Sequence, residues 1–383
     1  MKKVKRFFTY LLAIIISITL FSSCNDKANT IEEKPVEITE QFDFTNSNHI
    51  NWFGRTYLSD ENEMNFNNTI SGFELNFYGT QLTAEITAQG GASGKCWLAI
   101  FIDKETDPQL ATALELKDGT NSYKLVEGLN EDIHTIKVLR RTEIQFAPIS
   151  ALKSISCDGK FYTPPKKETR KIDYYGASSN CGYGSLGETD DLNFSTDTED
   201  GTSAFSYYAS TMLNAQSNVF CASGWGLGVS TTRSIPNVFE QYTINNKTNW
   251  NFENYVADVV VINLGYNDQK TFGSSGTQLY LDKREEFKEL LLDFCRKIYM
   301  YYPDSYIYIS YGIWSEYQIY DLYQEVVKEL NDEGKTKVIA FKLYTPKTTA
   351  SSKEIGSVYH ASYVAHKKMA EGLSADIKEK MGW

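Results

Sequence analysis

Two different patterns of hydrophobic and polar positions divide the chain. Between about residues 41 and 160, short runs alternate apolar with polar residues and are separated by turn residues. The clearest runs are 73–77, 82–86, 97–102 and 133–139. Strands at this spacing, with no helical stretch between them, predict an antiparallel β-sandwich.

After Pro164-Pro165, apolar strands alternate with amphipathic stretches of helical length. The predicted strands are 171–175, 218–222, 257–264, 305–311 and 337–341, and the predicted helices are 203–214, 282–300, 316–331 and one beginning near 362. This alternation predicts an α/β domain, in which helices cover both faces of a parallel sheet.

The N-terminus has the pattern of an export signal. A basic segment at 2–6 precedes the apolar segment 11–21, which is too short to span a membrane as a mature helix. Phe21-Ser22-Ser23-Cys24 then resembles a lipobox, with Phe21 in place of the usual leucine. We expect a signal peptide at 1–23 and lipidation of Cys24; a plain secretory signal is the alternative.

The expected domain organisation follows from these patterns. The polar segment 24–40 is expected to be a flexible tether. The β-sandwich is expected at 41–163 and the α/β domain at 164–383. The protein would then be exported and anchored by lipid to the cell envelope, on the periplasmic side or at the cell surface.

Charge and composition narrow the classes of partner. The chain of 383 residues has a formal net charge of -11, so the basic field that nucleic-acid binding needs is missing. Aromatic residues make up 14% of the chain, which is compatible with carbohydrate binding, although β-rich cores also collect aromatic residues.

Cysteine and histidine spacing predicts no metal site and no cofactor. The cysteines other than Cys24 are odd in number and none has CxxC spacing, so no disulfide framework is implied. The four histidines lack the spacing of a metal motif. They are His49, His134, His360 and His366.

Candidate chemistry lies directly after the predicted strands, where parallel sheets bind ligands. Ser178 follows Gly176 after the first strand and could act as a nucleophile if a base is near. Gly224 and Asn267 follow the second and third strands and could supply N–H groups to an oxyanion. His360, before the last helix, is the candidate base.

These residues resemble the SGNH hydrolase superfamily, and more closely the family 2 carbohydrate esterases. The similar segments include 123–129 and 134–143 in the sandwich and Cys181-Gly182-Tyr183-Gly184 after the serine. The resemblance implies an SGNH three-layer sandwich preceded by a jelly-roll domain. It also implies that Ser178 and His360 are catalytic and that Ser178, Gly224 and Asn267 form the oxyanion hole.

Three positions depart from the family pattern. Ala177 replaces the aspartate of Gly-Asp-Ser, Ser357 replaces the triad acid three positions before the histidine, and Ala361 replaces a proline. The resemblance allows a Ser-His dyad in which a backbone carbonyl orients the histidine. Asp268 is expected to be structural rather than a substitute acid.

The resemblance implies an esterase that removes O-acetyl groups from xylan, mannan or glucomannan, with primary 6-O-acetyl positions among its expected sites. The alternative is a surface glycan-binding protein that has lost catalysis, and a third possibility is an esterase for another acyl ester. Trp225 and Tyr266 would line the acyl or sugar pocket or else pack in the core. We expect a monomer whose partner is a carbohydrate. His366 is expected to face away from the site, His134 to be a structural residue, and the segment 166–170 to be a solvated connection.

Overall fold

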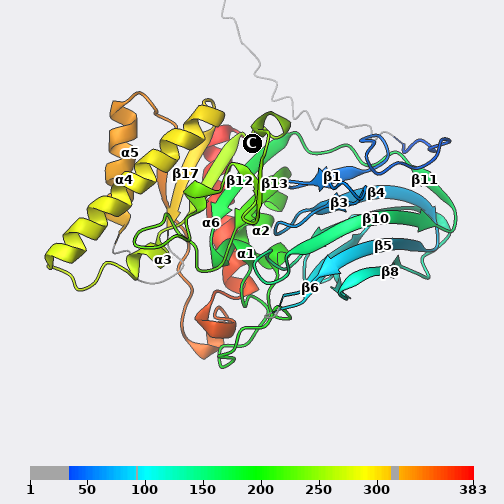
Figure 1. The fold of residues 1–383 in the computed structure, drawn as a ribbon, viewed down its shortest axis with the longest axis horizontal. Helices are drawn as coiled ribbons and strands as arrows, with labels where there is room; N and C mark the ends of the chain where they lie inside the picture. The colour runs from blue at the N-terminus through cyan, green and yellow to red at the C-terminus, as the bar shows by residue number, and fades with distance from the viewer. Residues whose placement is uncertain (1–33, 92–93, 312–318) are drawn as a thin grey trace, which may run out of the picture. The chain divides into compact units, whose positions relative to one another are not determined.

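The predicted parallel sheet is present in the computed structural model, with strand order β13-β12-β16-β17-β18 (Figure 1). Its strands are β12 (Arg170–Gly176), β13 (Ala215–Cys221), β16 (Val259–Asn263), β17 (Tyr306–Tyr311) and β18 (Val338–Lys342). Every neighbouring pair is parallel, so all carboxyl ends lie at one edge. The strand order reverses at β12, and the turns after β12, β13 and β16 therefore meet at this edge.

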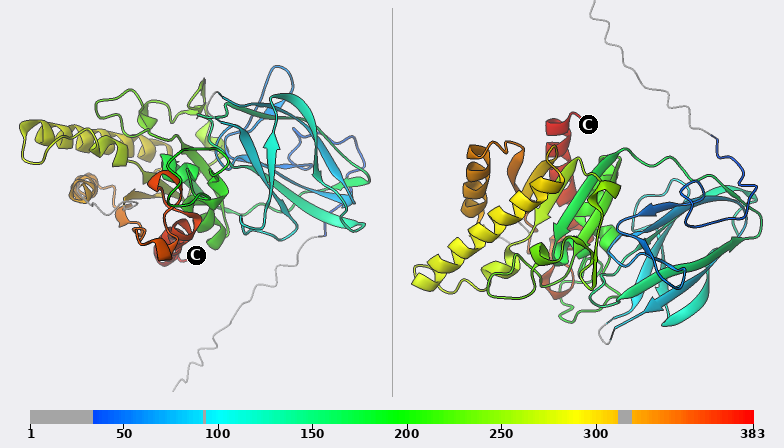
Figure 2. Two further views of the ribbon diagram at one scale, coloured as in Figure 1. Left: turned by 90° about the horizontal axis from the view of Figure 1, so that it is seen from below. Right: turned by 45° about the horizontal axis from the view of Figure 1, so that its top comes forward.

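Helices cover both faces of this sheet (Figures 1 and 2). On one face, α4 (Gln278–Tyr301) and α5 (Tyr320–Asp332) share a core with Val260 and Ile262 of β16. On the other face, α2 (Phe205–Met212) and α6 (Tyr363–Met381) share a core with the alternate residues Val259 and Val261. Alternate side chains of β16 are therefore buried in the cores on the two faces, as expected for a strand that is covered on both sides.

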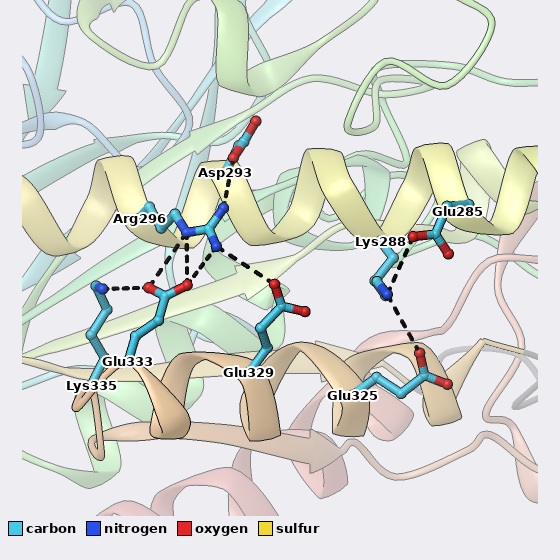
Figure 3. Close-up of polar contacts among 8 residues, drawn as sticks. All are labelled: Glu285, Lys288, Asp293, Arg296, Glu325, Glu329, Glu333 and Lys335. Carbon is cyan, nitrogen blue, oxygen red and sulfur yellow. Dashed lines mark hydrogen bonds and ion pairs between the residues drawn. The ribbon is translucent and has the colours of Figure 1, made fainter.

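Ion pairs join α4 and α5 across the space between the two helices (Figure 3). Arg296 contacts Glu329 and Glu333, and Lys288 contacts Glu325. Hydrogen bonds from Arg296 and Lys335 lower the pKa of the exposed Glu333 carboxyl to about 2. Exposed pairs of this kind each contribute about 0–1 kcal/mol to stability. The charged side chains on these helices pair with one another, so they do not indicate a binding site for a charged ligand.

Residues 51–162 contain two antiparallel sheets, with strand orders β1-β4-β9-β6-β7 and β2-β3-β10-β5-β8, while β11 pairs with β4. The strands are β1 (Asn51–Phe53), β2 (Tyr57–Leu58), β3 (Met64–Asn65), β4 (Gly72–Gly79), β5 (Leu82–Gln89), β6 (Cys96–Ile102), β7 (Thr112–Leu116), β8 (Gly119–Val126), β9 (Asp132–Arg140), β10 (Ile149–Cys157) and β11 (Lys160–Tyr162). Phe73 and Leu75 from one sheet and Ala84 and Ile86 from the other share one buried core. The predicted two-sheet sandwich is confirmed; its jelly-roll connectivity stays a prediction.

The sandwich contacts the α/β part through buried groups. The Arg55 side chain, which is 0% exposed, donates from Nη2 to the Tyr175 hydroxyl of β12 at 3.0 Å. The rings of Phe101 on β6 and Tyr207 on α2 stack with centroids 5.8 Å apart. Pro35–Trp383 accordingly form one unit.

The structure describes residues 34–91, 94–311 and 319–383. The expected signal peptide 1–23, the lipidation site Cys24 and residues 25–33 of the expected tether lie outside these ranges. The end of the expected tether differs from the prediction, because the Ile38 N–H donates to the Phe161 carbonyl at 2.9 Å and the Thr163 N–H donates to the Val36 carbonyl at 2.8 Å. Ordered pairing with the sandwich therefore begins before residue 41.

Candidate active site

Ser178 begins a short helix, α1 (Ser178–Cys181), immediately after β12. Glycines make this tight turn possible. A Cβ on Gly176 would lie 1.9 Å from Asn180 Oδ1, and a Cβ on Gly182, whose φ is +72°, would lie 1.9 Å from the Asp200 carbonyl oxygen. The turn places Ser178 at the carboxyl edge of the sheet, with the backbone N–H groups of a first helical turn beside it.

His360 contacts Ser178 as predicted from the sequence. Ser178 Oγ lies 3.0 Å from His360 Nε2, and the Val358 carbonyl oxygen lies 3.0 Å from His360 Nδ1. A carbonyl oxygen can only accept, so Nδ1 bears the proton and Nε2 has the lone pair that accepts the Ser178 hydroxyl proton. This arrangement puts His360 in the tautomer that a general base for Ser178 needs.

The backbone that presents this carbonyl is strained. Val358 has φ 52° and Tyr359 has φ 58°, so two consecutive non-glycine residues adopt the left-handed region. Each such residue costs about 1–3 kcal/mol and persists only where the surrounding structure holds it. In this conformation the Val358 carbonyl faces the imidazole of His360.

Burial keeps His360 neutral. Burial, with a smaller contribution from the positive charge of Lys270, lowers the pKa of His360 to about 4, although the hydrogen bond to the Val358 carbonyl opposes this shift. The Tyr183 ring lies 4.5 Å from the His360 ring between centroids and stacks on Phe194 at 4.1 Å. The Tyr183 ring therefore lies against the imidazole, and with its lowered pKa His360 is a proton acceptor at neutral pH.

The two candidate oxyanion residues lie on turns beside Ser178. In the register of the sheet Gly176 is opposite both Cys221 and Asn263, so the turns that follow these three residues are neighbours. Gly224 is exposed and has φ +80°. Asn267, on α3 (Tyr266–Gln269), donates from Nδ2 to the Trp225 carbonyl at 2.8 Å. That bond orients the amide and leaves its second N–H for another acceptor.

Asp268 is structural, as expected. Its buried carboxylate accepts the N–H groups of Leu227, Gly228 and Val229 at 3.0, 3.0 and 3.1 Å. Burial raises the pKa of Asp268, and the three N–H donors oppose that rise. Asp268 therefore holds the loop that follows Gly224 and is not aimed at His360.

No side-chain acid occupies the triad position among the described residues. Ser357 Oγ donates to Asp191 Oδ2 at 3.0 Å, and a Cβ on Gly187 would lie 1.5 Å from that Oγ. The Ser357 side chain thus packs against the 187–191 loop, while Val358 supplies the acceptor for His360. The group that orients the base is a backbone atom.

The aromatic candidates are half-buried. Trp225 and Tyr266 both pack against the core beneath α4, and the Trp225 Nε1–H donates to Gln145 Oε1 at 2.9 Å. Tyr359 was not anticipated from the sequence, yet it precedes His360 directly and is 58% exposed. The sequence did contain an indication of this residue. An aromatic residue next to a candidate base is a candidate for packing against the apolar face of a sugar.

Two further histidines and two cysteines make structural contacts. His366 is buried, and its Nδ1 accepts the Phe205 N–H at 3.3 Å. His134 Nε2 donates to the Asn130 carbonyl at 2.9 Å. Cys181 and Cys221 are unbridged, with their Sγ atoms 2.7 Å apart behind the site.

The described residues contain neither a metal-binding cluster nor a membrane-spanning helix. Within residues 34–91, 94–311 and 319–383, no group of His, Cys, Asp or Glu side chains could hold a metal ion, and no helix has the length and apolar character to cross a membrane. A cavity of about 190 Å³ is lined by Phe53, Lys137 and Ser217, among others, near the start of β13. It lies at the opposite end of the sheet from Ser178.

Comparisons with known proteins agree with this architecture. The family model described as "Carbohydrate esterase 2 N-terminal" matches residues 52–165. The cellulase/esterase CelE of Acetivibrio thermocellus is 31% identical over 340 residues, which are 86% of this chain and 39% of the relative. The chain therefore spans about two fifths of that protein.

Solved structures of the same type are also similar. A family two carbohydrate esterase from Clostridium thermocellum, in complex with cellohexaose, is 28% identical with a TM-score of 0.78, over 87% of this chain and 99% of that one. An acetyl xylan esterase (Est2A) from the rumen bacterium Butyrivibrio proteoclasticus has a TM-score of 0.80 at 19% identity, over 91% and 100% of the two chains, and shows the shared fold.

The fold and the site are of the SGNH hydrolase type. They combine a serine after β12, a histidine before α6, and turns with a glycine and an asparagine between them. The sandwich that precedes this fold matches one family in particular. Together the comparisons indicate a family 2 carbohydrate esterase, since the family model matches the sandwich and the similarity to CelE extends over most of this chain.

Proposed function

We propose that this protein is an esterase that removes O-acetyl groups from plant-type polysaccharides or oligosaccharides. The observation that supports this most directly is the chain of contacts from Ser178 Oγ to His360 Nε2 and from His360 Nδ1 to the Val358 carbonyl, each 3.0 Å long. The nucleophile and its base are within hydrogen-bonding distance, and the base has an acceptor that selects its tautomer.

In the proposed mechanism, Ser178 Oγ attacks the acetyl carbonyl carbon while its proton moves to His360 Nε2. The oxyanion is stabilised by the backbone N–H groups of Ser178 and Gly224 and the free amide N–H of Asn267. The C–O bond to the sugar then breaks, and His360 Nε2 returns the proton to the sugar oxygen. Water, deprotonated by His360, hydrolyses the acetyl-enzyme and releases acetate.

The substrate class rests on the aromatic groups near the site and on the relatives. Tyr359 is exposed and directly precedes His360 in the chain, and Trp225 and Tyr266 are the sequence neighbours of Gly224 and Asn267. The related structures include a complex with cellohexaose and an acetyl xylan esterase. We therefore favour acetylated xylan, mannan or glucomannan as substrate, bound by a monomer that needs no metal or cofactor.

The alternative function is glycan binding without catalysis, motivated by Ala177 and Ser357. Acetate release from acetylated xylan by the wild type and by Ser178→Ala distinguishes the two. The esterase proposal predicts release that Ser178→Ala abolishes. Equal, negligible release with retained binding of the polysaccharide would favour the binding protein.

We also propose that the mature protein is exported and lipid-anchored through Cys24. Labelling of cells with a tagged fatty acid tests this. Lipid should be incorporated into the wild type and not into Cys24→Ala, which should leave the membrane fraction. An unlabelled wild-type protein would indicate a plain secretory signal.

A further inference from the structure

Two glutamates that the proposed mechanism does not use lie beneath the oxyanion turn. Glu143, in the segment after β9 of the sandwich, and Glu199, in the loop before α2, are both 0% exposed. Glu143 Oε2 accepts the Ser223 N–H at 2.7 Å, and the Glu143 N–H donates to Glu199 Oε2 at 3.3 Å. Ser223 is the residue immediately before Gly224.

A second sandwich residue binds the same turn from its exposed side. Gln145 Nε2 donates to the Ser223 carbonyl at 3.2 Å, and Gln145 Oε1 accepts the Trp225 Nε1–H at 2.9 Å. Both residues flanking Gly224 are therefore bound by the sandwich. Gly224 has no side chain and a φ of +80°, so its N–H direction depends on these neighbours.

The pKa of each carboxyl group is raised by its surroundings. Burial raises the pKa of Glu143 and of Glu199, and the negative charge of Glu143 raises that of Glu199 further. The Oε1 atom of each group is buried and has no hydrogen-bond partner among the described residues, and a protonated Glu199 could donate to Glu143. The titratable and charged groups around the pair are Arg140, Arg141, Cys181, Tyr183, Asp200 and Cys221.

We propose that Glu143 and Gln145 are positioning residues of the active site, which aim the Gly224 N–H at the oxyanion by holding Ser223 and Trp225. The proposal rests on the proposed esterase function, since it assigns a task within that reaction. It makes the sandwich a structural part of the catalytic site. Removal of one oxyanion donor costs about 10²–10³ in kcat in a well-studied protease, which bounds the effect expected from misplacing one.

The test compares Glu143→Ala with Glu143→Gln on an acetyl ester. Glu143→Ala removes the acceptor of the Ser223 N–H, so kcat should fall about 10–100-fold while KM changes less than about threefold. Glu143→Gln keeps an acceptor oxygen and should retain kcat within about fivefold of the wild type. A merely structural role would lower thermal stability without this difference between kcat and KM.

Asp173→Asn is the matched control for loss of a buried carboxylate. Asp173 is also 0% exposed and accepts from the Tyr175 and Tyr302 hydroxyls at 2.7 and 3.0 Å, remote from the oxyanion turn. The Asp173→Asn variant should have a lower melting temperature and an unchanged kcat in the folded protein. If Glu143→Ala does not fold, the half-buried Gln145→Ala provides the same test, with kcat expected to fall about tenfold.

The outcomes separate this proposal from the function on which it rests. Wild-type kcat in Glu143→Ala, or in Gln145→Ala where that variant stands in, would overturn the positioning role while leaving the esterase intact. Equal loss in Glu143→Gln and Glu143→Ala would overturn it also, because the acceptor oxygen would then be irrelevant. A wild type no more active than Ser178→Ala would overturn both proposals.

Discussion

The carbonyl oxygen of Val358 lies 3.0 Å from Nδ1 of His360, two residues further along the chain. In serine hydrolases with a full triad, a carboxylate at this place orients the imidazole and stabilises its protonated form. A backbone carbonyl can orient the imidazole in the same way, but it carries only a partial negative charge with which to stabilise the protonated form. The left-handed backbone at Val358 and Tyr359, with φ of 52° and 58°, makes the geometry possible.

The pH profile tests the state of His360. Burial lowers the pKa of His360 to about 4 from its ordinary 6.5. The histidine is a base only when neutral, so activity should persist as pH falls and be lost only as pH passes through about 4. Rates of acetate release measured from about pH 3 to pH 8, on both sides of this pKa, test the prediction. A half-maximal rate near pH 6.5 would show that the imidazole is not desolvated in solution.

Restoring an acid at the family's position should not improve the enzyme. Ser357→Asp would place a second carboxylate against Asp191 and crowd Gly187, so we expect a loss of roughly 1–3 kcal/mol in stability and no gain in kcat. Denaturant melts and initial rates measure both. Ser357→Ala, which removes only one hydrogen bond, is the control and should keep the wild-type kcat. A rise in kcat in Ser357→Asp would mean that residue 357 can reach His360.

Tyr359 should matter for sugars and not for the chemical step. Its exposed ring can stack on a sugar face for about 0.5–1.5 kcal/mol, so Tyr359→Ala should raise KM for acetylated xylan about 3–10-fold. The kcat/KM for 4-nitrophenyl acetate should not change. Tyr363→Ala, at another exposed tyrosine at the start of α6, is the control. An equal loss on both substrates would place Tyr359 in the support of His360 instead.

The buried Glu199 should make the fold less stable as pH rises. Unfolded, its carboxyl loses a proton above about pH 4.5, whereas burial and Glu143 raise the folded-state pKa. The stabilising effect of the retained proton is complete below that pH and is lost as pH rises toward the folded-state pKa. Melting temperatures at pH 5 and 8 should therefore differ less in Glu199→Gln than in the wild type. The exposed Glu371→Gln should keep the wild-type difference, and an unchanged difference in Glu199→Gln would contradict the assignment.

The fold was largely predictable because its strands have strong local patterns. The buried run at 257–264 and the alternating run at 133–139 match β16 (Val259–Asn263) and β9 (Asp132–Arg140) within two residues. The helix expected at 282–300 is α4, which begins earlier, where Thr277 accepts the Tyr280 N–H at its N-terminus. The link between Val36–Ile38 and β11 was missed, because it is a long-range pairing of a polar segment.

The candidate site was predictable only where side chains identify it. Ser178, Gly224, Asn267 and His360 stand at turns that a parallel sheet brings together. The acceptor for His360 is a backbone oxygen, which has no side-chain signature in the sequence. Glu143 belongs to the other part of the chain, and only the tertiary contact with Ser223 places it at the site.

The most direct test of the central claim is the rate of acetate release from a defined acetylated xylo-oligosaccharide by the wild type, Ser178→Ala and His360→Ala. If Ser178 is the nucleophile and His360 its base, the wild type releases acetate and each variant loses about 10³-fold or more of that rate while still folding and binding the oligosaccharide. Wild-type release equal to that of Ser178→Ala would contradict it.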